Sequence, residues 1–162
     1  MKHIVPGRMT ADRREPFAVF LIGMRINRLL RVDKWWPVFA AMPRMVRELE
    51  SNPSLGFLGA YSWFGRTSIM LQYWESFEKL EAYATASEHE HLPAWRDFNR
   101  RLRGSNAVGV WHETYLAGPC RYEAVYVNMP RFGLGGATSL IKAEGVREHA
   151  RQRLRPSDNG PG

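Results

Sequence analysis

Apolar residues along the chain fall into alternating strand-like and helix-like patterns. Residues 17–24 are almost continuously apolar and rich in strand-forming side chains, which predicts a strand buried on both faces. Residues 38–49 repeat their apolar side chains at helical spacing, with charged residues on the other faces. They predict an amphipathic helix, in which Pro43 removes a backbone donor and is expected to produce a kink.

A β-hairpin is predicted next. Residues 55–64 and 67–74 are both rich in strand formers, and Gly65 and Arg66 between them suit a short turn. Alternate side chains along the first arm are apolar on both faces, so this sheet needs apolar cover on both sides.

The second helical region is expected in two pieces, at residues 76–87 and 93–103. Ser76 is a suitable N-cap for the first piece. Pro93 separates the two, because the residue before a proline avoids helical geometry.

Two strands are predicted after these helices, at residues 108–116 and 122–128, with Gly118 and Pro119 between them. The resulting order is β-α-β-β-α-β with one added C-terminal strand. This order predicts an α+β fold of the ferredoxin-like class.

The domain organisation follows from length and from the ends of the chain. Residues 17–145 are expected to form one domain, since 162 residues suit a single core. Residues 1–16 are polar and contain Pro6 and Gly7, so an irregular N-terminal arm is expected. Residues 146–162 are expected to be a basic, disordered tail.

One sheet with two apolar faces and helices for only one of them predicts a partner subunit. Two such sheets packed face to face make a dimeric α/β barrel, in which each subunit keeps a cavity between its sheet and its helices. We therefore expect a homodimer that binds a hydrophobic small molecule.

Composition narrows the possible compartments and partners. Cys120 is the single cysteine, and neither a secretory leader nor an apolar run long enough to span a membrane is apparent. A cytoplasmic protein without a membrane partner is expected. The net charge of +7 suggests polyanions, but the sequence contains no recognisable nucleic-acid-binding motif, and nucleic acid is not expected as a partner.

Several motifs carry a family resemblance. They are VFLIGMRIN at 19–27, HLPAWRDFN at 91–99, VWHETY at 110–115, and NMP at 128–130 with GLG at 133–135. With these motifs the chain resembles a family of monooxygenase-like proteins in the dimeric α/β-barrel superfamily. The resemblance implies chemistry of one of three kinds: cofactor-free monooxygenases, haem-degrading enzymes, or haem-dependent aldoxime dehydratases.

The expected function is therefore a monooxygenase-like oxidoreductase acting on a hydrophobic substrate. The alternatives are a haem-binding lyase or dehydratase of aldoxime-dehydratase type, and a non-catalytic ligand-binding protein. No cofactor is required by the first interpretation, haem is required by the second, and no metal ion is expected beyond the haem iron.

His112 and Glu113 are the first candidates for catalysis. Strand alternation places His112 in phase with Val110 and Thr114, whereas Glu113 faces the opposite way. If the Val110 face lines the cavity, His112 is the general base, and if the other face does, Glu113 is the base. A purely structural histidine is the remaining alternative.

His91 is a third candidate, because an unbroken helix would turn it toward the sheet. His91 or His112 is then the axial ligand if haem is bound, and Arg96 or Arg25 binds a propionate or substrate carboxylate. The alternative is that residues 88–91 form only a polar joint. The further candidates for substrate binding are aromatic or polar side chains near the expected cavity: Tyr61, Trp63, Trp95, Phe98 and Asn99.

Overall fold

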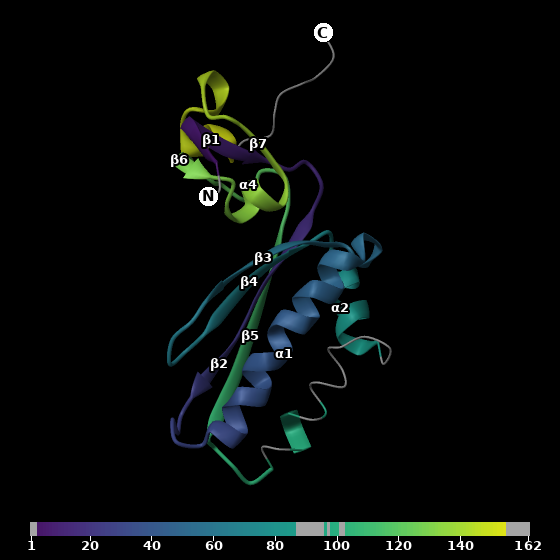
Figure 1. The fold of residues 1–162 in the computed structure, drawn as a ribbon. Coiled ribbons are helices and arrows are strands. Elements are labelled where there is room, and N and C mark those ends of the chain that lie inside the picture. Colours follow the sequence, from purple (N-terminus) through teal and green to yellow (C-terminus); the bar gives the residue numbers. More distant parts are fainter. Residues whose placement is uncertain (1–2, 87–95, 97, 101–102, 155–162) are drawn as a thin grey trace. The chain divides into compact units, whose positions relative to one another are not determined.

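The computed structural model describes residues 3–86, 96, 98–100 and 103–154, and the chain forms two compact units (Figure 1). The larger unit is Ala18–Tyr115, and the smaller unit combines Met1–Phe17 with Leu116–Gly162. The predicted α+β class is confirmed.

The larger unit is a four-stranded sheet with the strand order β3-β4-β2-β5. Two helices lie against one face of it (Figure 1). The strand and helix order along the chain, together with this strand order, is the predicted ferredoxin-like topology. Its elements are β2 (Phe17–Ile26), α1 (Val32–Ser51), β3 (Phe57–Trp63), β4 (Ile69–Trp74), α2 (Phe77–Thr85) and β5 (Val108–Ala117).

Helix α1 is longer than its apolar repeat predicts, because it already begins at Val32. Pro37 and Pro43 both lie inside it without ending it. The expected cap of α2 is confirmed, since the Ser76 hydroxyl accepts a hydrogen bond from the backbone N–H of Lys79 at 3.3 Å. Most of the helix expected at 93–103 lies outside the described residues, which show helix at 96 and 98–100.

The core of the larger unit lies between the sheet and the two helices. Ala18 and Trp74 are fully buried there and pack against Leu49 of α1 and Leu80 of α2. The indole N–H of Trp74 donates to the side-chain oxygen of Gln72 at 2.9 Å, so the buried donor is satisfied.

The strand register defines which side chains face the helices. In the antiparallel pairing of β2 with β4, Ala18 lies opposite Trp74 and Ile22 lies opposite Met70. Because Ala18 and Trp74 pack on the helices, the helix-facing side of β2 carries its even-numbered residues. Gly23 and the other odd-numbered residues lie on the opposite side.

The smaller unit is a three-stranded antiparallel sheet in which the central strand comes from the N-terminus. Its strand order is β6-β1-β7, formed by β1 (Ile4–Asp12), β6 (Tyr126–Pro130) and β7 (Ser139–Lys142). The expectation of an irregular arm at residues 1–16 is therefore wrong. Gly7 has φ +83° and lies where the β1–β6 register shifts, so it forms a bulge inside the strand instead of ending it.

The C-terminal part also differs from the expectation. The added strand, predicted at 122–128, is β6 and pairs with β1 instead of extending the larger sheet. Residues 133–137 form the short helix α4 (Gly133–Ala137). The tail was expected to be disordered from residue 146, but Gly145–Arg147 forms a 3-10 turn and Ala150–Arg153 forms α5.

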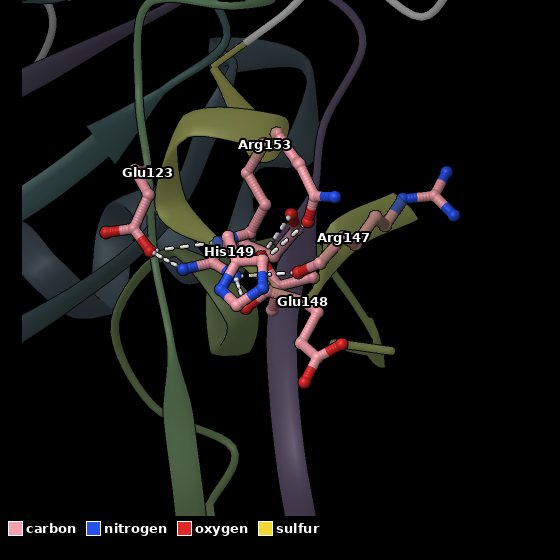
Figure 2. A network of polar contacts seen from close by, with 8 residues as sticks. Glu123, Arg147, Glu148, His149 and Arg153 are labelled. Carbon is pink, nitrogen blue, oxygen red and sulfur yellow. Dashed lines mark hydrogen bonds and ion pairs between the residues drawn. The ribbon is translucent and has the colours of Figure 1, made fainter. Parts of the chain in front are cut away.

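Arg153 holds this C-terminal segment together. Its guanidinium forms an ion pair with Glu123 and donates to the backbone carbonyls of Arg147 at 2.6 Å and Glu148 at 2.8 Å (Figure 2). The backbone N–H of His149 donates to the Gln152 side chain at 2.8 Å and caps α5. Basic composition alone suggested disorder, whereas a single buried guanidinium orders the segment.

Candidate active-site cavity

A cavity of about 760 Å³ lies within the larger unit, between α1 and the sheet. The helix-facing residues Ile22 and Met24 of β2, Met70 of β4 and Val110 of β5 form its sheet side. Residues 36–47 of α1 form much of the rest, together with Phe98.

Methionines make up an unusual share of this lining. Met24, Met42, Met45 and Met70 contribute four of the seven methionines in the chain. Their unbranched, polarisable side chains repack easily around a ligand, so the lining can adapt to an irregular apolar molecule.

The polar groups along the cavity are hydroxyls and cations. Ser68 is bonded to the backbone of Met24, whose N–H donates to the hydroxyl at 3.2 Å. Lys34, Arg44 and Arg47 supply positive charge at the lining. Among the described lining residues there is no His, Asp, Glu or Cys, so this part of the cavity provides binding surface and cations without a general base.

His112 lies on the helix-facing side of the sheet, close to the cavity. It is two residues from Val110, on the same face of β5, and its ring lies against Phe20 with the ring centroids 5.8 Å apart. The imidazole is exposed and is not part of the described lining. The face of β5 that carries Val110 and His112 is therefore the one that points toward the helices.

Glu113 lies on the other side of the sheet. Its carboxylate accepts a hydrogen bond from the Tyr115 hydroxyl at 2.7 Å, and both side chains are exposed. This bond and the carboxylate charge raise the pKa of Tyr115, because both favour the protonated phenol. His112 and Glu113 therefore point away from each other and cannot act as a dyad.

Trp111 is a residue that the sequence interpretation missed. Its indole lies over Gly23 on the side of the sheet opposite the helices, and its Nε1 donor is buried without a hydrogen-bond partner in the described structure. Gly23 allows this packing because a Cβ there would lie 2.7 Å from the indole nitrogen and 2.0 Å from the Ser68 carbonyl oxygen. The small residue in an otherwise bulky strand was the available signal.

The other predicted site residues are dispersed. Phe98 is buried and lines the cavity, in a cluster with Met24 and Val108. Arg25 lies on the opposite side of the sheet and donates to the Thr67 hydroxyl at 2.8 Å. Arg96 and Asn99 are exposed. The register places Tyr61 and Trp63 opposite Leu71 and Ile69, on the side away from the helices, while His91 and Trp95 lie outside the described residues.

No group of three His, Cys, Asp or Glu side chains in the described part of the chain is arranged to hold a metal ion. The cations and thioethers of the cavity could receive the propionates and the apolar ring of a haem. No histidine is among the described lining residues, so the lining itself supplies no imidazole for the iron. His112 lies two residues beyond the lining residue Val110, on the same face of β5.

Comparison with known proteins gives a family match over most of the chain. The model of the family described as "Monooxygenase af470-like" matches residues 17–134. Monooxygenase af470 of Aspergillus fumigatus is 27% identical over 146 residues, which cover 81% of this chain and 51% of that protein. The chain thus spans about half the length of this curated relative.

Two solved structures share the fold. A crystal structure of aldoxime dehydratase matches with a TM-score of 0.67 at 18% identity, covering 88% of this chain and 45% of that one. The aldoxime dehydratase OxdRE, crystallised with butyraldoxime, matches with a TM-score of 0.65 at 15% identity, covering 78% and 40%. At these identities the likeness shows the fold alone.

Proposed function

Because the chain belongs to the monooxygenase af470-like family, we propose that it is an oxidoreductase that oxygenates a hydrophobic small molecule bound between α1 and the sheet. The observation that carries this proposal is the apolar, methionine-lined cavity of about 760 Å³. Its volume lies within the range of about 300–1,000 Å³ that is typical of small-molecule sites.

The proposed reaction needs a base, an anionic substrate and dioxygen. His112 removes a proton from an acidic carbon or phenol of the substrate, and the resulting carbanion transfers its electrons to dioxygen. One oxygen atom becomes the carbonyl oxygen of the product, and the other leaves as water. The two hydrogens of that water come from the oxidised CH₂ group of a ketone, or from the hydroxyl and the oxidised ring carbon of a phenol. Arg44 and Arg47 favour the anionic substrate, and the apolar lining keeps bulk water from quenching the carbanion.

This reaction sets a length on the substrate. His112 follows Val110 by two strand positions, or about 7 Å. A substrate whose apolar body occupies the cavity must therefore project past Val110 toward Phe20 to present its acidic proton to the imidazole. The proposed substrate class is an extended, largely apolar molecule with an activated phenol or enolisable carbon at one end.

A homodimer is part of the same proposal. The side of the larger sheet opposite the helices carries Tyr61, Trp63, Leu71, Trp111 and Tyr115, which form an aromatic and apolar surface. A second copy packed on this side would supply the missing cover, and the cavity would remain on the helix-facing side. We place the protein in the cytoplasm.

A haem-dependent lyase or dehydratase is the second candidate function, favoured by the fold shared with the aldoxime dehydratases. Haem would supply a Lewis-acidic, redox-active iron to an apolar substrate. In this chain the cations at the cavity would hold the propionates, and His112 or His91 would bind the iron.

Oxygen consumption by the purified protein tests the leading proposal. A panel of naphthols and enolisable ring ketones is offered without added cofactor, and at least one member is expected to be consumed together with oxygen. Ala41→Leu fills the cavity and should raise the KM, whereas Ala82→Leu makes the same change on the exposed face of α2 and should not.

The two candidate functions separate in the absorption spectrum. Haemin is added to the purified protein, and the Soret band is compared between the wild type and His112→Ala. A band that shifts in the variant, in a protein that consumes no oxygen, would overturn the monooxygenase proposal in favour of the lyase. If members of the panel bind but are not turned over, and added haemin gives no Soret band, both enzymatic proposals are overturned. The protein would then be a ligand-binding protein.

A further inference from the structure

The turn between β2 and α1 carries two leucines at its tip. The backbone N–H of Arg31 donates to the carbonyl of Arg28 at 3.1 Å, which closes the turn and leaves Leu29 and Leu30 as its central residues. Leu30 is 96% exposed and Leu29 is 59% exposed. Central turn positions usually carry Gly, Pro, Asn or Asp, so two exposed leucines need a reason outside the fold.

These leucines continue into an exposed aromatic cluster. The indole N–H of Trp35 donates to the carbonyl of Leu29 at 3.0 Å and joins the turn to the start of α1. From there the rings of Trp36, Phe39 and Phe64 follow one another, with centroids 5.8 Å and then 5.3 Å apart. We call the exposed members of this surface the apolar tip: Leu29, Leu30, Val32, Trp36 and Phe64.

Cations surround the apolar tip. Arg28 and Arg31 flank the two leucines, Lys34 lies in the first turn of α1, and Arg66 follows Phe64 in the hairpin turn. Within residues 26–36 and 64–67 the one carboxylate is Asp33, and it is already bonded to Arg31 at 2.8 Å.

A polar notch lies beside the turn. Arg28 and Arg31 form one side of it and residues 104–106 the other. Ser105 adds a hydroxyl to the two guanidinium groups. Because Arg31 already bonds Asp33 through Nε and Nη2, Arg28 is the main cation here for a phosphate oxygen.

We propose that this end of the larger unit docks on the surface of an anionic lipid membrane. Leu29, Leu30 and Trp36 would enter the headgroup region, where exposed leucines gain burial and tryptophan is favoured. The surrounding cations would meet lipid phosphates, with one headgroup in the notch of Arg28 and Arg31. The charge pattern favours this occupant over a second copy of the chain, because a second copy would bring the same cations together.

Docking of this kind does not require a spanning segment. No helix in the described part of the chain is long and apolar enough to cross a membrane. No membrane partner was expected because the sequence shows no apolar run long enough to span a membrane. Contact with the membrane surface does not need such a run.

Docking would also bring the cavity to a source of apolar molecules. Trp36 and Phe64 belong to the apolar tip and also line the cavity, so a molecule could pass from the lipid without crossing water. This consequence rests on the proposed function, whereas the docking itself does not.

Co-sedimentation of the full chain with vesicles tests the docking without any substrate. Phosphatidylcholine vesicles with and without phosphatidylserine are compared at low and high salt. Binding is expected with phosphatidylserine and should weaken at high salt. The double variant Leu29→Ser with Leu30→Ser should bind at least about tenfold more weakly. Val146→Ser, which removes a similarly exposed apolar side chain from the smaller unit, should bind like the wild type.

Three results would overturn the docking proposal. They are no binding to phosphatidylserine vesicles, equal binding by the wild type and the double leucine variant, and a lower oligomeric state of that variant in solution, which would make the tip a protein contact. Oxygen consumption with a water-soluble substrate is independent of all three, so a failure of the docking is distinguishable from a failure of the proposed function.

Discussion

The imidazole of His112 lies against the ring of Phe20, with ring centroids 5.8 Å apart and planes tilted by 45°. Phe20 also packs against the core that joins Ala18 and Trp74 to the two helices. The contact therefore ties the orientation of the imidazole to the rigid part of the larger unit and keeps it on the side of the sheet where the cavity lies.

Replacing His112 by alanine is expected to lower the turnover of any substrate whose oxygen consumption is established. Loss of a positioned general base costs about 10²–10⁴-fold in kcat. The substrate-binding surface near Val110 stays in place, so the KM should change little. Steady-state oxygen-electrode kinetics measure both parameters.

Glu113→Gln is the matched control, because it alters the neighbouring residue on the opposite side of the strand and should leave kcat unchanged. If Glu113→Gln abolishes turnover and His112→Ala does not, the base lies on the other side of the sheet.

A methyl group at Gly23 is expected to destabilise the larger unit. The Ser68 carbonyl oxygen lies 2.0 Å from the position of the new Cβ and the Trp111 indole nitrogen 2.7 Å from it, so the backbone at Ser68 and the Trp111 indole must both move. Gly23→Ala should lower the free energy of unfolding by about 1–3 kcal/mol, the usual cost of overpacking. Urea denaturation followed by tryptophan fluorescence measures it.

Gly109→Ala is the corresponding control in the neighbouring strand β5. The nearest atom to its Cβ position is 3.7 Å away, which is an ordinary contact. This variant should therefore unfold at the same urea concentration as the wild type or at a slightly higher one. Equal losses in both variants would show that strand flexibility, not the close approach at Gly23, decides the cost.

The pKa of Tyr115 should fall when Glu113 becomes glutamine. In the wild type the hydrogen bond to the Glu113 carboxylate, and then its charge, raise the pKa of this phenol. Glu113→Gln removes the charge, so the phenolate should form at lower pH, nearer the ordinary value of about 10. The hydrogen bond contributes its full stability at pH values below the pKa of Tyr115 in the unfolded chain. This contribution is lost as the pH rises through the higher pKa of Tyr115 in the folded protein.

Phenolate absorbance measured against pH follows this titration. The difference between each protein and its Tyr115→Phe counterpart isolates one of the six tyrosines. An unchanged midpoint in Glu113→Gln would mean that the hydrogen bond does not persist in solution.

The sequence predicted those parts of the fold that depend on local patterns. The apolar repeat of α1 and the alternation in β5 depend only on neighbouring residues, and both elements are present. Strand β1 was missed because Pro6 and Gly7 look like a break, while its partner β6 is more than 110 residues away. Local patterns carry no information on such a pairing.

The candidate site was predictable to a similar extent. Strand alternation predicted that His112 and Glu113 lie on opposite faces of β5. Because both faces of the sheet are apolar, alternation could not identify the face that lines the cavity. The packing of Val108 with Met24 and Phe98 in the structure identifies it. The apolar repeat of α1 predicts a buried face, but such a stripe looks the same whether it meets a packed sheet or a cavity.

Arg153 should be indispensable for the order of the C-terminal segment. Its side chain is only 6% exposed, and it holds Glu123 and two backbone carbonyls through one guanidinium (Figure 2). Arg153→Ala leaves these acceptors without their donor and should lower the stability of the segment by about 2 kcal/mol. Amide hydrogen exchange in residues 145–154 should accelerate accordingly.

Arg153→Lys should not rescue this order, because one ammonium cannot reach the same set of acceptors as the planar fork. Arg151→Ala provides the charge-matched control, since Arg151 lies in the same helix with an exposed side chain and should exchange like the wild type. If Arg151→Ala accelerates exchange as much as Arg153→Ala, general charge or helix propensity holds the segment, and the contacts of the buried guanidinium do not.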